Sequence, residues 1–276
     1  MYQGFFINLA GNETRRKSLS KHLEEIGAAS RYQRIEAVEG RTVAHQYQSK
    51  LEPGALGCWL SHLNILRANS GAKTHLHVIE DDTIFARNAA SEFDDLLKFA
   101  ETEYSDWDLI FTDIYIVPAD VQAGRHLSKM LLKSQKTKST LLLNLQRIAF
   151  AGTSSYFVNW RSIDKYTKLI SSPDPDGVPI DLHLRKLVNQ KLLKAYVTMP
   201  FQTSVSPDSL QSDISGEIGR SRAVYHTFRR AYFRDADVPS LDAEMQKLIQ
   251  GVGLSPVEIL HLKALLFTLS DQYVDF

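Results

Sequence analysis

Hydrophobic residues recur along the chain with two different periods, and each period predicts one kind of element. Short runs rich in aromatic and β-branched residues predict strands, at Tyr2–Leu9, Arg31–Val38, His75–Ile79, Trp107–Val117, Ile148–Asn159 and Leu192–Met199. Leucine and isoleucine at helical spacing predict the intervening helices, at 12–27, 53–71, 161–170 and 180–189. Strands that alternate with helices predict an α/β fold in three layers, with a largely parallel sheet.

Two segments depart from this alternation. Lys133–Thr140 is rich in Lys, Ser and Thr and predicts a mobile loop. The tail Ser240–Phe276 predicts helix, with a break at residues 254–256 and an amphipathic helix over Val257–Leu269. We therefore expect an α/β domain over residues 1–215 and a helical C-terminal region over residues 216–276, which could contact a membrane or form a homodimer.

Composition narrows the class of protein. The 276 residues are 43% hydrophobic and carry no formal net charge, which indicates a globular protein and argues against a dedicated nucleic-acid binder. The single cysteine, Cys58, excludes a disulfide framework and favours a reducing compartment. No apolar run approaches the ~20 residues that a membrane-spanning helix needs. We expect a cytoplasmic protein.

Neutrality hides a strong asymmetry of charge along the chain. Glu80–Asp113 has a net charge of −9, Gln122–Arg147 of +6, and Gly216–Ala236 of +3. In the last stretch arginines alternate with Tyr and Phe, a pattern that suits an anionic membrane surface. The simpler interpretation is an amphipathic helix whose aromatic residues pack inward. For all three blocks, a solvated face is the plain alternative.

The sharpest local feature is the acidic triplet Glu80-Asp81-Asp82 at the end of a hydrophobic strand. Ligands of open α/β sheets bind at the carboxyl ends of strands. Mg²⁺ and Mn²⁺ prefer carboxylate oxygens, and like charges this close are costly without a cation. Because alternate residues of an extended chain face the same way, we expect Glu80 and Asp82 to share a metal site and Asp81 to face elsewhere. An acidic turn or a helix cap is the alternative.

A second feature precedes the triplet, in the segment Leu51–Leu63. Gly54 and Gly57 allow close backbone approach near the start of a helix, whose N-terminus can receive phosphate. Ser61 and His62 follow one turn later. A lone His on a helix is commonly a core or capping residue, so His62 by itself does not indicate a functional site.

Together these motifs resemble glycosyltransferase family 25, the family of bacterial lipooligosaccharide galactosyltransferases. The resemblance rests on motifs that occur in the family's order: FINL at 6–9, Arg15-Arg16, EAVEG at 36–40, PGALGCWLSH at 53–62 and IEDD at 79–82. It is dense over Tyr2–Phe85 and resumes at 152–158, 179–181 and 212–214. Ala55 stands where the family often has Glu, and Glu39 where it has Asp.

The resemblance implies a GT-A-like fold, with a Rossmann-type nucleotide-binding half, a nucleotide-sugar donor such as a UDP-hexose, and Mn²⁺ or Mg²⁺. Glu80 and Asp82 match the ends of the family's DxD-equivalent motif, with Asp82 the better candidate for the metal. The residues that match donor-side motifs are Asn8, Arg15, Ala37, Gly40, Gly57, Ser61, His62, Glu80 and Asp81.

The base that takes the proton of the acceptor hydroxyl is expected to be a carboxylate. Asp181 matches a late aspartate of the family, and Asp113 is the second candidate because it also ends a buried strand. Asp181 opens a predicted helix, so a capping role is equally compatible with its position. Inversion at the anomeric carbon is an expectation from the family alone.

These inferences lead to an expected function. We expect a metal-assisted glycosyltransferase that moves a hexose, galactose from UDP-galactose, onto a lipid-linked lipooligosaccharide or lipopolysaccharide acceptor at the inner membrane. A nucleotidyl- or phosphoryl-transfer enzyme is an alternative, weakened by the lack of any G-x-x-x-x-G-K-[ST] or G-x-G-x-x-G motif. A non-catalytic carbohydrate-binding protein is the other alternative.

Overall fold

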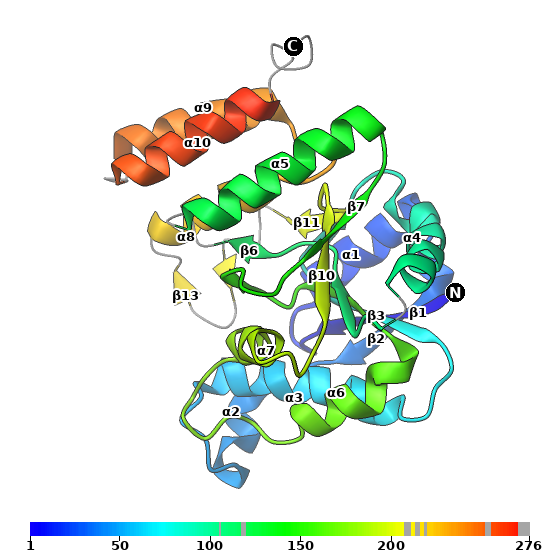
Figure 1. The fold of residues 1–276 in the computed structure, drawn as a ribbon. Helices are drawn as coiled ribbons and strands as arrows, with labels where there is room; N and C mark the ends of the chain where they lie inside the picture. Colours follow the sequence, from blue (N-terminus) through cyan, green and yellow to red (C-terminus); the bar gives the residue numbers. More distant parts are fainter. Residues whose placement is uncertain are drawn as a thin grey trace.

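A seven-stranded sheet forms the centre of the protein (Figure 1). The structure, a computed structural model, describes residues 1–104, 106–116, 120–206, 211–212, 216–217, 220–251 and 255–269. The strand order is β2-β1-β3-β9-β5-β10-β7. The strands are β1 Tyr2–Asn8, β2 Tyr32–Glu36, β3 His75–Glu80, β5 Leu109–Phe111, β7 Leu141–Asn144, β9 Ser155–Val158 and β10 Ala195–Met199. Only β7 and β9 run against the other five, so the expected α/β fold with a mostly parallel sheet is confirmed.

Helices cover both faces of this sheet, because successive side chains of each strand point to opposite faces. On β1, Phe5 and Ile7 join a core with α3 Pro53–Ala68, α6 Ile163–Leu169 and α7 Ile180–Asn189. Phe6 joins the opposite core with α1 Glu13–Glu25 and α4 Ala89–Glu103. Short helical turns complete this part of the chain: η1 Ala29–Arg31, α2 Gly40–Val43, η2 Ala44–Gln46 and η3 Trp160–Ser162.

Several helix boundaries agree with the sequence prediction. The side chain of Asn12 caps α1 by accepting a hydrogen bond from the backbone of Arg15. Pro53 occupies the first position of α3, and α7 has the predicted bounds. Among the described residues, none of the helices combines the length and apolar character that crossing a bilayer requires.

Two predicted strands are each divided in the structure. The run Trp107–Val117 contains β5 and the short β6 Tyr115–Ile116, and the run Ile148–Asn159 contains β8 Phe150–Ala151 and β9. β6 pairs with β8 outside the main sheet. The break in the second run falls at Gly152, whose φ of +94° is incompatible with a continuing strand. A further small pair, β4 Thr83–Phe85 with β11 Thr203–Val205, follows the acidic triplet, and β12 Gln211–Ser212 pairs with β13 Gly216–Glu217.

The predicted mobile loop at Lys133–Thr140 is wrong for most of its length. Helix α5, Val121–Thr137, continues through it. The helix forms because residues at helical spacing, Ala123, Leu127 and Leu131, are buried while the lysines point to solvent.

The C-terminal helices pack on the main domain. They are α8 Arg220–Ala231, α9 Val238–Gly251 and α10 Pro256–Leu269. Phe228 of α8 and Tyr232, which directly follows α8, are buried in the core that also holds α3 and α5, and α10 contacts α5 (Figure 1). These aromatic residues therefore do not form a membrane surface, which corrects that interpretation of Gly216–Ala236. Arg222 and Tyr225, also in that stretch, have side chains outside the described residues.

Candidate active site

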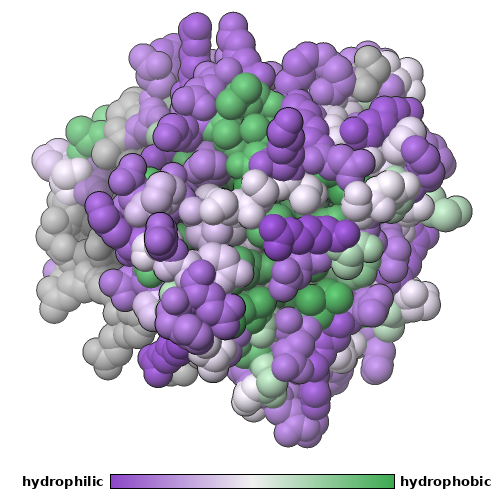
Figure 2. All heavy atoms as spheres, turned by 90° about the horizontal axis from the view of Figure 1, so that it is seen from below, coloured by the Kyte–Doolittle hydropathy of each residue, from purple (hydrophilic) through white to green (hydrophobic). Residues whose placement is uncertain are grey.

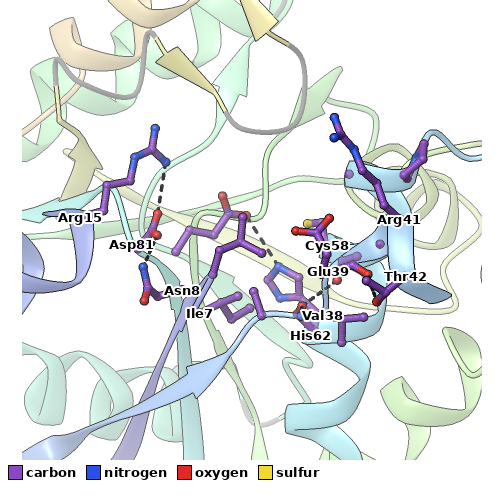
Figure 3. Close-up of a pocket in the computed structure, with 18 of the residues that line it drawn as sticks. Ile7, Asn8, Arg15, Val38, Glu39, Arg41, Thr42, Cys58, His62 and Asp81 are labelled. Carbon is purple, nitrogen blue, oxygen red and sulfur yellow. Dashed lines mark hydrogen bonds and ion pairs between the residues drawn. The ribbon is translucent and has the colours of Figure 1, made fainter. Parts of the chain in front are cut away.

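A cavity of about 760 Å³ opens at the carboxyl edge of the sheet (Figure 3). The edge gathers the predicted residues because β1, β2 and β3 are parallel neighbours, with Ile7 opposite Glu80 and Asn8 opposite Glu36. All of the predicted donor-binding and metal-binding residues line this cavity: Asn8, Arg15, Ala37, Gly40, Gly57, Ser61, His62, Glu80, Asp81 and Asp82. Sequence motifs that lie far apart along the chain thus form one site.

Asp81 does not face away from the cavity, contrary to the prediction from strand alternation. The strand ends at Glu80, and Asp81 and Asp82 lie in the turn before β4. One carboxylate oxygen of Asp81 accepts a hydrogen bond from Asn8 Nδ2 at 2.7 Å, and the other pairs with Arg15 Nη1 at 3.2 Å. Asn8 is itself held by Arg34, whose Nε donates to Asn8 Oδ1 at 3.0 Å. The charge of Asp81 is therefore partly compensated within the protein, although burial keeps its pKa above the ordinary value.

Glu80 and Asp82 differ from Asp81, and Glu80 accepts a hydrogen bond from Thr153 Oγ1 at 3.2 Å and lies 3.7 Å from His62 Nε2. Neither forms an ion pair with a Lys or Arg among the described residues, and Asp82 Oδ1 is buried without a hydrogen-bond partner in that same set. Burial, followed by the charge of Glu80, raises the pKa of Asp82 to about 7. Burial also acts to raise the pKa of Glu80, but His62 and Arg229 outweigh it, and that pKa lies below the ordinary value.

This pair fits a hard divalent cation. Two partly buried carboxylates with an orphaned oxygen, on the wall of an open cavity, match the ligand set that Mg²⁺ and Mn²⁺ take from proteins. A cation between them would offset the effects that raise the pKa of Asp82, which are burial first and then repulsion by Glu80. Glu80 and Asp82 are thus the residues that would hold the metal.

The glycines of the cavity serve the packing of the chain on itself. A Cβ on Gly40 would overlap the carbonyl oxygen of Pro53, and one on Gly57 would overlap that of Val38. Ser61 completes this contact, because its Oγ accepts from Val38 N at 2.9 Å and donates to Gly57 O at 2.6 Å. The segment 37–40 is thereby clamped to α3, and the close approach predicted from the glycines occurs here between two stretches of backbone.

The two candidate bases lie outside the residues that line the cavity, in different surroundings. Asp113 is buried, and its carboxylate pairs with Arg229 and accepts a hydrogen bond from Ser154. Asp181, at the start of α7, is half-buried and accepts backbone hydrogen bonds from Gly152 at 2.9 Å and from Leu182 at 2.8 Å. Its charge reaches the cavity wall, because it contributes to the raised pKa of Cys58, of which burial is the main cause.

Two charged residues of this region were not identified from the sequence. Arg229 reaches Asp113 across 116 positions of the chain, so no local pattern connects them. Arg41 lines the cavity on the side away from Arg15, is exposed, and forms no ion pair with any described residue (Figure 3). In the sequence, the position of Arg41 directly after Gly40 was the signal that could have identified it.

Comparison with known proteins gives the family of the chain. Procollagen galactosyltransferase 1-A of Xenopus laevis is 31% identical over 125 residues, which are 39% of this chain and 20% of that protein. The alignment therefore spans about a fifth of that relative's length. UDP-glucose pyrophosphorylase, in its crystal structure complexed with UDP-glucose, is 13% identical with a TM-score of 0.35 over 72% of this chain and 91% of that chain. Residues 1–184, two thirds of the 276, match the family described as glycosyltransferase family 25 (LPS biosynthesis protein), and the chain belongs to this family.

Proposed function

We propose that this glycosyltransferase moves galactose from UDP-galactose onto a lipooligosaccharide or lipopolysaccharide core acceptor, with metal assistance and inversion. One observation carries the proposal: Glu80 and Asp82, without a Lys or Arg partner among the described residues, face a cavity large enough for a nucleotide sugar. Family membership gives the reaction class. The choice of galactose follows the similarity to the frog procollagen galactosyltransferase.

The acidic and the basic residues of the cavity have different roles in the proposed reaction. A divalent cation held by Glu80 and Asp82 would supply Lewis-acid neutralisation of the charge that grows on the departing diphosphate. Arg15 and Arg41, on two sides of the cavity, would bind and orient the phosphates by charge-assisted hydrogen bonds (Figure 3). The clamped segment 37–40 forms a wall that keeps the donor in register with these groups.

Turnover of UDP-galactose tests this proposal. With Mn²⁺ we expect slow hydrolysis of UDP-galactose in the absence of an acceptor and none after chelation, with UDP as the nucleotide product. Release of UMP together with galactose 1-phosphate would support the alternative of nucleotidyl transfer. Binding without any hydrolysis, even with lipooligosaccharide added, would support a carbohydrate-binding protein and overturn transferase activity.

Asp181 is the better candidate for the base. Asp113 is fully buried and bound to Arg229, whereas Asp181 is half-buried and each of its oxygens retains a second lone pair. We expect Asp181→Asn to lower kcat by about 10²–10⁴-fold, the range for loss of a general base, with little change in KM for the donor. Steady-state kinetics checks this. A kcat within about threefold of wild type, with thermal stability alone reduced, would assign Asp181 to helix capping.

We also propose that α5, and not Gly216–Ala236, faces the anionic inner membrane. Arg125, Lys129, Lys133 and Lys136 are exposed along α5, which bears no acid. Beside them lies an apolar groove of about 480 Å³ with α10, where Leu260 is 70% exposed. Basic and apolar groups together complement anionic lipid. The side carrying α2, α3, α6 and α7 is largely hydrophilic, with separate hydrophobic patches (Figure 2).

Vesicle binding tests this surface. We expect Lys129→Gln/Lys133→Gln to weaken binding to anionic vesicles about thirtyfold, since each basic residue contributes about 1 kcal/mol there. Lys17→Gln/Lys21→Gln on α1, whose core lies on the other face of the sheet, is the matched control and should bind as wild type does. Equal binding to neutral vesicles, or a homodimer that buries α10, would contradict the proposal.

A further inference from the structure

Behind Glu80, the cavity wall holds a second group of metal-ligating atoms. Cys58 and His62 are four residues apart on α3, so their side chains lie on the same face of the helix. The thiol sulfur, the imidazole nitrogen and a carboxylate oxygen of Glu80 all lie within 4.8 Å of one another. All three residues line the cavity, which leaves room for a water or a ligand as a fourth partner.

His62 has the arrangement of a metal ligand. It is fully buried, and its Nδ1 is held by the hydroxyl of Tyr156 at 2.8 Å, with the two rings stacked. Its Nε2 has no hydrogen-bond partner among the described residues and lies 3.7 Å from Glu80 Oε1 (Figure 3). When the imidazole donates its Nδ1–H to this hydroxyl, the ring is held in place and Nε2 is left unprotonated for a metal. A buried nitrogen without a partner is costly in any other role.

The ligand types select the metal. A thiolate with an imidazole and a carboxylate favours Zn²⁺, which takes four ligands, over the hard cations Mg²⁺ and Mn²⁺. We propose that Cys58, His62 and Glu80 form a second, zinc-selective site that shares Glu80 with the Glu80–Asp82 pair. Zinc there would draw Glu80 away from Asp82 and inhibit transfer, a consequence that rests on the proposed function.

Cobalt spectroscopy tests the site without any assay of activity. Cys58 is the only cysteine of the chain, so a cobalt–thiolate absorption band from metal-free protein with Co²⁺ would report this residue alone. We expect one Co²⁺ per chain, displaced by one Zn²⁺. Cys58→Ser should lose the band, and His62→Gln should weaken binding at least tenfold. Asp82→Asn is the matched control and should retain the band.

A second measurement guards against misfolded variants. In the wild-type protein, one equivalent of Zn²⁺ should slow alkylation of Cys58 at least tenfold, whereas Mg²⁺ should not. The absence of a thiolate band together with an unchanged alkylation rate would overturn the site.

Inhibition is measured separately, as the ratio of rates with and without Zn²⁺ for each variant. We expect micromolar Zn²⁺ to inhibit wild type at least tenfold more strongly than Cys58→Ser. Zinc binding without inhibition would leave the site intact and contradict only its link to the proposed reaction.

Discussion

Asp82→Asn is expected to remove transfer and at the same time to stabilise the metal-free protein. The loss should be at least about a hundredfold in kcat, because loss of one group that stabilises transition-state charge costs about 10²–10³. The gain in stability comes from removing a charge that the metal-free folded protein disfavours. Asp82 is partly buried beside Glu80, and burial together with the charge of Glu80 raises its pKa to about 7, so the folded state disfavours its charge.

The pH dependence of that gain follows from the sign of the shift. A carboxyl whose folded pKa is raised destabilises the fold once the unfolded chain ionises, so the cost begins above its ordinary pKa near 4 and is complete above pH 7. Asp82→Asn should therefore unfold at higher temperature than wild type at pH 8 and at the same temperature near pH 4.

The neighbouring Asp81→Asn is the control for this pair of effects. It breaks the contact with Arg15, so it should lower activity, and because Asn8 and Arg15 oppose the effect of burial on the pKa of Asp81, it should stabilise the fold less than Asp82→Asn does. Thermal unfolding with and without Mn²⁺ completes the measurement, because a ligand that binds only the folded state raises the unfolding temperature. Retained transfer by Asp82→Asn, or a loss of its stability at pH 8, would contradict its role as a metal ligand.

Several residues that line the cavity could be placed together from the sequence because their positions follow from topology. Parallel strands end at one edge of the sheet, so Asn8, Ala37 and Glu80 had to meet there once three strands were recognised. The helix α3 was equally predictable, since Pro53 begins it and leucines follow at helical spacing. These signals are local or periodic, so they can be recognised in a single amino-acid sequence.

Other features depend on tertiary contacts that a single sequence does not encode locally. The lysines of Lys133–Thr140 suggested a loop, whereas the buried residues that make α5 a helix begin upstream, at Ala123. In the sequence, Phe228 and Tyr232 are equally compatible with a membrane-binding helix and with a helix packed on the domain. Only the structure, which places both in the core, distinguishes the two. Arg229 looked like one more surface arginine until the fold placed it against Asp113.

Arg229→Met is expected to lower the free energy of unfolding by about 3–5 kcal/mol. Arg229 and Asp113 are both fully buried, and removing one partner leaves the other charge unpaired in the core. Burial already raises the pKa of Asp113 and Arg229 counteracts it, so the variant should bury Asp113 in its protonated form. Urea unfolding at pH 7 measures the loss.

The adjacent Arg230→Met gives the matched control, because Arg230 is 26% exposed and pairs with Glu244, which is also partly exposed. Such a pair contributes about 0–1 kcal/mol, so this variant should unfold close to wild type. The double variant Arg229→Met/Asp113→Asn should recover part of the loss, because it removes the second charge together with the first. Equal effects of Arg229→Met and Arg230→Met would mean that the buried pair does not hold α8 on the sheet. In that case apolar contacts, including those of Phe228 and Tyr232, would hold the C-terminal helices in place.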